Sequence, residues 1–268
     1  MHMKIIFPQL ELHSIESNFT NDPHVHPAHY QMTIPLRGHC QFTHKSKERK
    51  LIAGEGLLLP PQNQHNFHQG AEDGIIIFQI NDDSLYPADA SSFPEPKYKY
   101  EFNPTEVSGF LHQWSSSFFL FGDSERLALE EKELQALHYV HGLIWGLESS
   151  YTKQLRTQHY QDNRYISRVL EYIHAHYSES IRIEQLSAIA LQSRYHFIRC
   201  FKSNTGLTPY QYVLKLRIEK AQQQLRQTQK SVMSISIELG FSSPSQFYRS
   251  FIKNVGITPE QYRSSTTI

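Results

Sequence analysis

The 268-residue sequence predicts an α+β protein of two domains, an N-terminal antiparallel β-barrel and a C-terminal all-α domain. Three observations predict this class. Short apolar runs separated by turn residues fill the first hundred residues, apolar positions at helical spacing fill the remainder, and one C-terminal segment occurs twice. The expected boundaries are residues 3–100 for the barrel, 101–151 for a helical segment, 152–163 for a linker and 164–268 for the all-α domain.

The N-terminal barrel is predicted from runs that are typical of short strands. Apolar stretches at residues 31–36, 56–59 and 74–80 alternate with segments rich in Gly, Pro, Asn and Asp. A spacing of roughly ten residues is typical of antiparallel barrels and sandwiches, in which each strand ends in a tight turn. Hydrophobic residues make up 39% of the chain, which is enough to fill a packed core in each domain.

The helical segment behind the barrel carries one stripe at helical spacing. Its positions are Leu134, Leu137, Val140, His141, Ile144 and Leu147. Such a stripe forms either the core of its own domain or the seam of a homodimer, and we expect the seam. Acidic residues Glu130, Glu131 and Glu133 lie near the start of this helix. Residues 152–163 are polar and lack apolar periodicity, so we expect them to form a linker.

The C-terminal domain contains an internal repeat at a constant offset of 50 residues. Ten pairs of identical residues align without a gap: Ser193/Ser243, Phe197/Phe247, Arg199/Arg249, Phe201/Phe251, Asn204/Asn254, Gly206/Gly256, Thr208/Thr258, Pro209/Pro259, Gln211/Gln261 and Tyr212/Tyr262. This agreement exceeds coincidence, so one structural unit occurs twice.

Each copy of the repeat is predicted to be a helix, a short turn and a second helix. The first helices carry apolar stripes, at Ile183, Leu186 and Ile189 in one copy and at Val232, Ile235 and Leu239 in the other. The turns pass through Leu191–Gln192 and Gly240, Ser193 and Ser243 cap the second helices, and Gly206 ends the first of these. Two helices joined by a short turn, with a polar outer face, are the helix-turn-helix plan.

A long helix is predicted between the two copies. Leu214, Ile218, Ala221 and Leu225 form one stripe on a helix that runs from about Pro209 to Gln227. A helix of this length spans about 28 Å. Successive major grooves on one face of B-DNA lie roughly 34 Å apart, so a rigid rod of this length would let the two copies enter adjacent grooves.

The charge distribution also favours a nucleic-acid partner for the C-terminal domain. From Arg164 to Ile268 there are 14 Lys and Arg against 6 Asp and Glu, a net charge of +8. The totals of 26 and 26 leave 12 against 20 before Arg164, a net charge of −8. A basic part beside an acidic part indicates that only the basic part meets a polyanion. The alternative is that the two domains merely attract each other.

These residues carry a resemblance to a known family. Residues 164–268 resemble the DNA-binding domain of the AraC/XylS transcription regulators, on Leu186–Ala190, Ser193–Lys202, Gly206–Pro209, Arg217–Ala221, Ile235–Phe241 and Phe251–Arg263. The resemblance implies seven helices, the first at about Tyr165–His176, and binding to promoter DNA near RNA polymerase. Ser236 departs from the pattern, since the family has a small apolar residue there, and a buried hydroxyl would need a local partner.

The residues that would contact DNA are those left facing outward when Phe197, Phe201, Phe247 and Phe251 face inward. In the first copy these are Ser193, Arg194, Tyr195, Ile198, Arg199 and Lys202, and in the second Ser243, Ser245, Gln246, Tyr248, Arg249 and Lys253. Arg reads guanine and Gln reads adenine, whereas Tyr and Ile touch thymine methyl groups. Ser193, Ser243 and Lys253 are expected to contact phosphates. For each basic residue the alternative is a solvated surface charge.

The barrel resembles the cupin-like sensor domain that this family usually carries. His24, His26 and Gln31 resemble the first cupin motif and His65 the second. The resemblance implies three His and one Glu at a metal, but Gln31 occupies the acidic position. We therefore expect these four residues to line the pocket of a small-molecule effector. A divalent metal at His24, His26 and His65 and a purely structural role are the alternatives.

Function classes can be weighed on these features. We expect a cytoplasmic, ligand-controlled transcription regulator with promoter DNA, RNA polymerase, a small-molecule effector and a second copy of itself as partners. A metal-dependent cupin enzyme with a DNA-binding tail is disfavoured because Gln31 removes a charged ligand. An architectural DNA-binding protein is the third possibility. No apolar run approaches the roughly 20 residues of a membrane span, and Cys40 and Cys200 lack metal or redox spacing.

Overall fold

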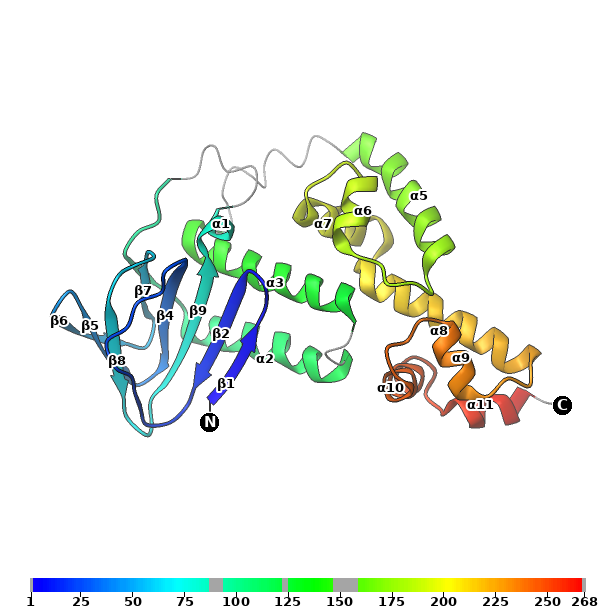
Figure 1. The fold of residues 1–268 in the computed structure, drawn as a ribbon, viewed down its shortest axis with the longest axis horizontal. Coiled ribbons are helices and arrows are strands. Elements are labelled where there is room, and N and C mark those ends of the chain that lie inside the picture. The colour runs from blue at the N-terminus through cyan, green and yellow to red at the C-terminus, as the bar shows by residue number, and fades with distance from the viewer. Residues whose placement is uncertain (1, 87–93, 122–124, 147–158, 267–268) are drawn as a thin grey trace. The chain divides into compact units, whose positions relative to one another are not determined.

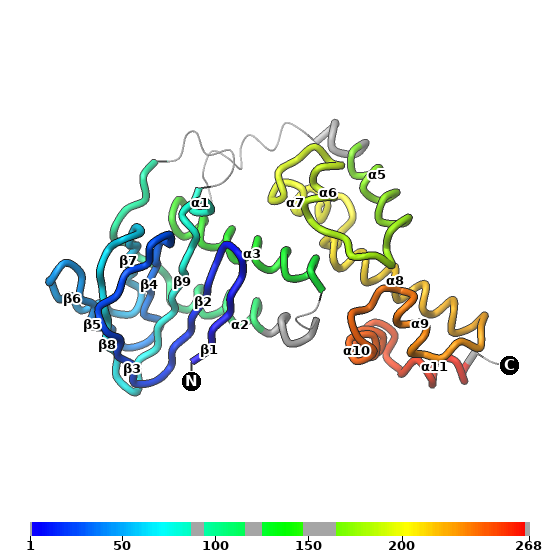
Figure 2. The backbone as a smooth tube through the Cα atoms, viewed as in Figure 1, coloured from blue at the N-terminus to red at the C-terminus, as the bar shows by residue number. Residues whose placement is uncertain are grey.

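The computed structural model describes residues 2–86, 94–121, 125–146 and 159–266. The chain forms two compact units, Met1–Trp114 with Gln135–Thr152 and Ser115–Leu134 with Lys153–Ile268. We call the first the sheet unit and the second the helical unit (Figures 1 and 2). Helix α3 (Arg126–Trp145) contributes to both, because the division falls after Leu134. No described helix is long and apolar enough to cross a membrane.

The sheet unit contains two antiparallel sheets. The six-stranded sheet has the order β1-β2-β9-β4-β7-β10 and the four-stranded sheet the order β3-β8-β5-β6. The strands are β1 (His2–Ile6), β2 (Leu10–Ile15), β3 (Phe19–Thr20), β4 (His29–Arg37), β5 (His39–His44), β6 (Lys47–Ile52), β7 (Glu55–Leu59), β8 (His65–Gln69), β9 (Gly74–Asn81) and β10 (Lys99–Glu101). The three apolar runs that predicted strands lie in β4, β7 and β9.

Strand β9 lies between two apolar layers. Ile75 and Ile77 join a core that includes residues of both sheets, such as Phe42 and Phe67. Successive side chains of a strand point to opposite faces, so Ile76 lies on the other face, where it is also buried. Helices α2 (Pro104–Phe121) and α3 lie beside this sheet in Figure 1. Burial on both faces explains why this strand appears in the sequence as a continuous apolar run.

The expected closed barrel is not found. Closure requires one continuous hydrogen-bonded ladder around all strands. Both edges of β4 are paired within the six-stranded sheet, by β7 and β9, and both edges of β5 are paired within the four-stranded sheet, by β6 and β8. The described strands therefore form two separate sheets that face each other across their shared core.

The apolar stripe of α3 lies in the core of the chain. Leu137, Val140 and Ile144 are buried, and the ring of His141 donates from Nε2 to the carbonyl of Ser84 at 3.2 Å, beside the short helix α1 (Asp82–Leu85). Leu147 lies outside the described residues. The expectation that this stripe is a homodimer seam is therefore corrected, because the stripe is already covered within one chain.

The helical unit begins with α3 and continues through the repeat. Its further helices are α5 (His159–His176), α6 (Ile183–Ile189), α7 (Arg194–Thr205), α8 (Pro209–Gln227), α9 (Val232–Glu238), α10 (Pro244–Val255) and α11 (Pro259–Thr266). The long connecting helix has the predicted bounds, and its apolar stripe is buried. Residues 159–163 of the expected linker form the first turn of α5, and 152–158 lie outside the described residues.

The repeat is explained by helix caps. Ser193 and Ser243 accept hydrogen bonds from the N–H groups of His196 and Gln246. Thr208 forms a reciprocal capping box with Gln211, and Thr258 repeats it with Gln261. Asn204 and Asn254 each donate to the carbonyl four residues earlier, at 2.8 and 2.7 Å. The capping residues have the same spacing in both copies because the backbone groups at the helix ends need hydrogen-bond partners.

The two helix-turn-helix turns share one hydrogen-bond pattern at an offset of 49 rather than 50 residues. Leu191 N–H donates to the carbonyl of Ala188, and Gln192 N–H to that of Ser187. Gly240 and Phe241 make the corresponding bonds in the second copy. The second turn has one additional residue, Ser242, before the N-cap Ser243. From the N-caps onward the two copies are therefore 50 residues apart. The hydroxyl of Ser236 finds its local partner in the carbonyl of Met233, at 2.8 Å, just as Ser187 bonds to Glu184.

Both turns require a left-handed residue, but only the second has glycine. Gly240 has φ +77°, and a Cβ there would lie 2.1 Å from the carbonyl oxygen of Ser178. Leu191 has φ +52° and its side chain is 74% exposed. A left-handed conformation costs an L-residue about 1–2 kcal/mol, whereas glycine adopts it freely.

We expect Gly240→Ala to lower the free energy of unfolding by more than about 2 kcal/mol, because steric overlap adds to the backbone strain. Leu191→Gly is the matched change in the other turn, and it should leave that free energy unchanged or raise it by up to about 1 kcal/mol. Urea unfolding followed by far-UV circular dichroism measures both. Equal losses in the two variants would contradict this account of the turns.

Candidate functional site

The first candidate DNA-contacting surface is the outer face of α7. Arg199 and Lys202 are exposed, whereas Arg194, Tyr195 and Ile198 are half-buried. Ile198 packs in part against the core of the helical unit, which leaves one edge of its side chain at the surface. The outward orientation expected for the first copy is therefore found for Arg199 and Lys202, and only in part for the other three, since the hydroxyl of Tyr195 is buried. Ser193 caps the helix, so its hydroxyl lies at the end of α7 where phosphates bind.

The second candidate surface is the outer face of α10. Ser245, Arg249 and Lys253 are exposed. Tyr248 is half-buried, and its hydroxyl donates to the carboxylate of Glu260. Ser243 caps this helix as Ser193 caps α7.

The expectation that Gln246 projects outward is wrong. Its side chain is only 2% exposed, and its Oε1 accepts hydrogen bonds from the backbone N–H and the hydroxyl of Ser242, at 2.9 and 2.7 Å. The additional residue in the second turn provides these donors. Gln246 therefore stabilises the turn before α10, and Ser245 occupies the exposed position beside it.

The start of α3 holds the first head, which we define as α6 and α7 with the start of α8. Glu130 Oε2 accepts from the N–H of Ile183, the first residue of α6, at 2.8 Å. Glu131 Oε1 accepts from the N–H of Tyr210 in the first turn of α8, at 2.6 Å. Each carboxylate meets the positive end of a helix dipole and binds an amide that has no partner within its helix. These acidic residues stand out in the sequence, but their contacts with α6 and α8 join segments that are distant in the chain, so the sequence does not predict them.

A second contact region of this kind surrounds Arg217 in α8. Its guanidinium is buried and pairs with Glu125, just before α3. It also donates to the carbonyls of Tyr177 and Glu179, at 2.6 and 3.0 Å. Residues 115–134 thus belong to the same compact unit as the helix-turn-helix elements, although the sequence analysis assigned them to the segment 101–151.

The sheet unit brings His24, His26 and His65 together. One ring nitrogen from each lies within 4.8 Å of the others. His24 and His65 direct Nδ1 to the backbone carbonyls of Asp22 and Asn63, both at 2.9 Å, so that Nε2 of each carries the free lone pair. His65 is buried, and its Nε2 has no hydrogen-bond partner among the residues that the structure describes.

The surroundings of the histidines keep two of them neutral. Burial lowers the pKa of His65 to about 4, against the effect of the Asn63 carbonyl. Burial, with the charge of His24, also lowers the pKa of His26. Gln31 is buried nearby and donates to Thr33 at 3.1 Å, and Gln79 donates to Gln31 at 3.3 Å. Neutral imidazoles with free lone pairs are the form that binds a divalent metal.

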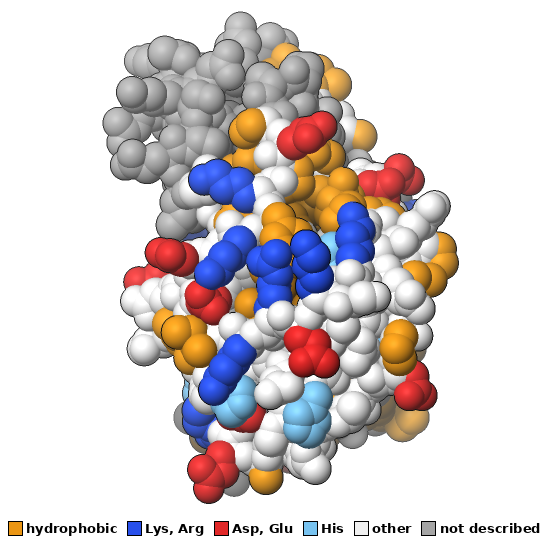
Figure 3. Space-filling view, turned by 90° about the vertical axis from the view of Figure 1, so that its left-hand side faces the viewer, with side chains coloured by type: hydrophobic (Ala, Val, Ile, Leu, Met, Phe, Trp, Pro, Cys, Tyr) orange, Lys and Arg blue, Asp and Glu red, His pale blue; other side chains and the backbone are white. Residues whose placement is uncertain are grey.

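A separate cavity of about 400 Å³ lies in the sheet unit. Its lining includes three tyrosines and two lysines, Tyr30, Tyr86, Tyr98, Lys45 and Lys97. His44, to which the sequence analysis assigned nothing, lines it as well and bonds to Tyr98 and Asn63. Figure 3 looks onto the side of this unit that carries β5 and β6, where Lys and Arg side chains gather. No pattern in the sequence indicated this cavity, because its residues come from distant segments.

Two exposed helices at equivalent positions of a helix-turn-helix repeat, which follows a sheet-rich unit in the sequence, are typical of a transcription regulator with a separate ligand-binding domain. The model of the AraC-like ligand binding domain matches residues 8–193, and a helix-turn-helix domain model matches residues 186–265. The chain belongs to the AraC family of transcriptional regulators.

Relatives of similar length are also regulators. The chain is 26% identical to the uncharacterized HTH-type transcriptional regulator YobQ of Bacillus subtilis, over 89% of this chain and 87% of the relative. It is 22% identical to the probable transcriptional regulator LumQ of Photobacterium leiognathi, over 97% and 98%. Among solved structures, the DNA-binding domain of AdpA in complex with a target DNA is 32% identical, with a TM-score of 0.36, and the match covers 37% of this chain and 90% of that one.

The buried carboxyl of Glu131 generates a pH prediction. Burial raises its pKa to about 7, although Thr208, the amide of Tyr210, Lys132 and Lys202 favour the charged form. Between about pH 4.5 and 7 the folded state therefore binds more protons than the unfolded state, so stability is lost as the pH rises. Glu131→Gln keeps a neutral acceptor and should be more stable than wild type at pH 8, on the order of 2 kcal/mol, but not at pH 4.5.

Urea unfolding at the two pH values measures this difference. Glu219→Gln removes an exposed carboxylate of the same unit, on α8, and should show no such pH dependence. A Glu131→Gln variant that is less stable than wild type at pH 8 would show that the charged carboxylate is the stabilising form.

Proposed function

We propose that the chain is a sequence-specific transcription regulator in which α7 and α10 read DNA and a small molecule bound in the sheet unit controls that reading. One observation carries the DNA-binding part. Arg199 and Arg249 occupy the same position of the repeat, both are exposed, and no ion pair holds either guanidinium among the described residues. Helix α8 connects the two helices, and its length of about 28 Å is close to the roughly 34 Å between adjacent major grooves.

The residues of the two faces take different roles in this proposal. Arginine at positions 199 and 249 would bond guanine, while Tyr195, Ile198 and Tyr248 would touch base edges or thymine methyl groups. Ser193, Ser243, Lys202 and Lys253 would contact phosphates, and Ser245 replaces Gln246 as the polar residue at the leading edge of α10. Arg194 and Pro244 differ at equivalent positions, so the two heads would read different sequences.

The family resemblance supports the remaining parts of the proposal. Helices α5–α11 would form the seven-helix DNA-binding domain, which acts in the cytoplasm at promoters near RNA polymerase. A homodimer would use a surface other than the buried stripe of α3. The long relatives are named as regulators, and we assign the chain no enzymatic activity.

We expect Arg199→Ala and Arg249→Ala each to weaken binding to the operator by about 1–3 kcal/mol, if each arginine makes a bidentate contact with guanine. Binding is measured by fluorescence anisotropy at fixed salt on an operator selected from random DNA, because phosphate contacts make affinity depend strongly on salt. Lys215→Ala, an exposed residue of α8, is the control of equal charge. If both arginine variants bind the operator as the control does, these faces do not read DNA.

The sensor proposal rests on the histidine cluster. His24, His26, Gln31 and His65 would form the effector site, and the three histidines would also suit a divalent metal because their ring nitrogen atoms converge. A bound metal would supply an open coordination position for an effector oxygen. The cavity beside Tyr98 is the second place where an effector could bind.

Zinc or nickel should raise the melting temperature of the protein by several degrees, reversibly with a chelator, because a ligand stabilises the state that binds it. His65→Ala should lose this shift, and His68→Ala, an exposed histidine outside the cluster, should keep it. Equal shifts in the two variants would place the metal elsewhere. A screen of small molecules on His65→Ala and Tyr98→Ala then shows which of the two sites takes the effector.

A further inference from the structure

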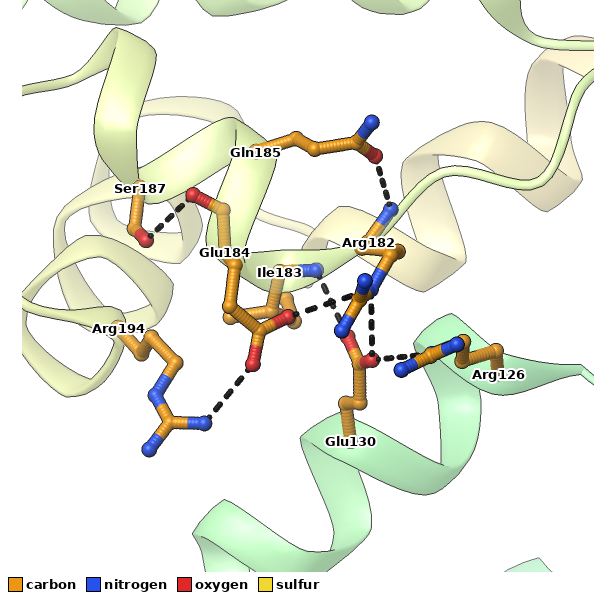
Figure 4. A network of polar contacts seen from close by, with 8 residues as sticks. All are labelled: Arg126, Glu130, Arg182, Ile183, Glu184, Gln185, Ser187 and Arg194. Carbon is orange, nitrogen blue, oxygen red and sulfur yellow. Dashed lines mark hydrogen bonds and ion pairs between the residues drawn. The ribbon is translucent and has the colours of Figure 1, made fainter.

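A chain of alternating charges leads from α3 to the first reading helix (Figure 4). Arg126 pairs with Glu130 at 2.9 Å, and Arg182 lies 3.7 Å from Glu130 and 3.8 Å from Glu184. Glu184 in turn pairs with Arg194 at 2.9 Å. All five side chains belong to the helical unit, and Arg194 is one of the residues expected to contact DNA.

The second head has no equivalent of this network. With the offsets of the repeat, Met233 occupies the position of Glu184, and Pro244 occupies that of Arg194. Helices α9 and α10 nevertheless form the same turn and the same cap as α6 and α7. The helix-turn-helix fold therefore does not require these charges, and their presence in one head needs another explanation.

The pair of Glu184 and Arg194 can open without loss of the fold. The side chains are 42% and 38% exposed, and a pair this exposed contributes little to stability because solvent screens its charges. Partial burial opposes ionisation of Glu184, but its own amide, Arg194 and Arg182 together lower its pKa, so it is charged at neutral pH. The guanidinium of Arg194 cannot bind this carboxylate and a DNA phosphate or guanine with the same N–H groups.

Arg182 connects this pair to α3. It lies almost equally far from the carboxylates of Glu130 and Glu184, so each competes with the other for its charge. While Glu130 attracts Arg182, Glu184 is less neutralised and holds Arg194 more firmly. If Glu130 moves away, Arg182 can turn fully to Glu184 and loosen its hold on Arg194.

We propose that Glu184 competes with DNA for Arg194, and that Glu130 on α3 sets the strength of this competition through Arg182. The inference rests on the proposed DNA contact of Arg194. Because Glu130 contacts the first residue of α6 and α3 continues past Leu134 into the sheet unit, a change at Glu130 would act on the first head through Arg182. Glu184 is thus a positioning residue, and its effect depends on Arg194.

The test begins with Glu184→Gln in the full-length chain. We expect about fivefold tighter binding to the operator than wild type, since about 1 kcal/mol of competition is removed. Glu219→Gln, which removes one exposed carboxylate from the Lys215 pair on α8, controls for general charge. In an Arg194→Ala background, Glu184→Gln should tighten operator binding no more than Glu219→Gln does.

Glu130→Gln tests the contribution of α3. Glu130→Gln should also tighten operator binding. In a chain that already carries Glu184→Gln, it should cause no further gain in affinity. Circular dichroism melting checks that the variant still folds. If it does not, Arg126→Gln serves as a second variant: it leaves Glu130 less neutralised, so Glu130 attracts Arg182 more strongly and operator binding should weaken. Equal gains from Glu130→Gln with and without Glu184 would overturn the role of α3.

The outcomes separate this inference from the proposed function. If Arg194→Ala leaves operator binding unchanged, the DNA contact of Arg194 is wrong. If Arg194→Ala weakens binding but Glu184→Gln behaves like Glu219→Gln, the contact stands and the competition is wrong. If Glu184→Gln weakens binding, Glu184 holds Arg194 in its binding orientation, and the proposed competition is overturned.

Discussion

The helical unit depends on the burial of one guanidinium, that of Arg217. It is 4% exposed in the middle of α8, pairs with Glu125, and donates to the carbonyls that follow α5. Its charge also lies 5.8 Å from the ring of Phe241, in the turn of the second head. Loss of one partner from a buried pair typically costs about 3–5 kcal/mol, because the other charge remains buried. The segment just before α3, the loop after α5 and the turn of the second head therefore meet at one residue, and all of its interactions must be satisfied together.

This constraint also explains why the two heads are alike in backbone and different in charge. The caps, the turns and the four buried phenylalanines repeat, since each head must close the same kind of helix end and bury the same kind of apolar face. The side chains around them are free to differ. The first head meets carboxylates of α3 at the amino ends of α6 and α8, whereas the second has Met233 and Pro244 where the first has Glu184 and Arg194. The carboxylates Glu130 and Glu131 thus contact the first head, and uncharged residues stand in the second head where the first has its ion pair.

In the sheet unit, the two sheets that enclose the apolar core also bring His24, His26 and His65 together at its edge. Six-stranded and four-stranded sheets enclose an apolar layer, and His65 extends from β8 into its edge beside Phe42, with the two rings stacked at 5.6 Å. An imidazole in such a place is neutral and has a fixed tautomer because a carbonyl holds Nδ1. The chemistry of the cluster, three nitrogen lone pairs and no carboxylate, follows from Gln31 in the position where a charged ligand would stand.

The sequence by itself determined the repeat, the bounds of α8, the caps at Ser193 and Ser243 and the exposed arginines of both heads. These features depend on residues three or four positions apart, so periodicity and capping rules are sufficient to predict them. Only the tertiary structure decided that Gln246 is buried, that the stripe of α3 is core, that the sheets do not close, and that Glu184 holds Arg194. Each of these depends on segments that are distant in the chain or on one additional residue in a turn, and pattern in a single sequence does not specify which distant side chains meet.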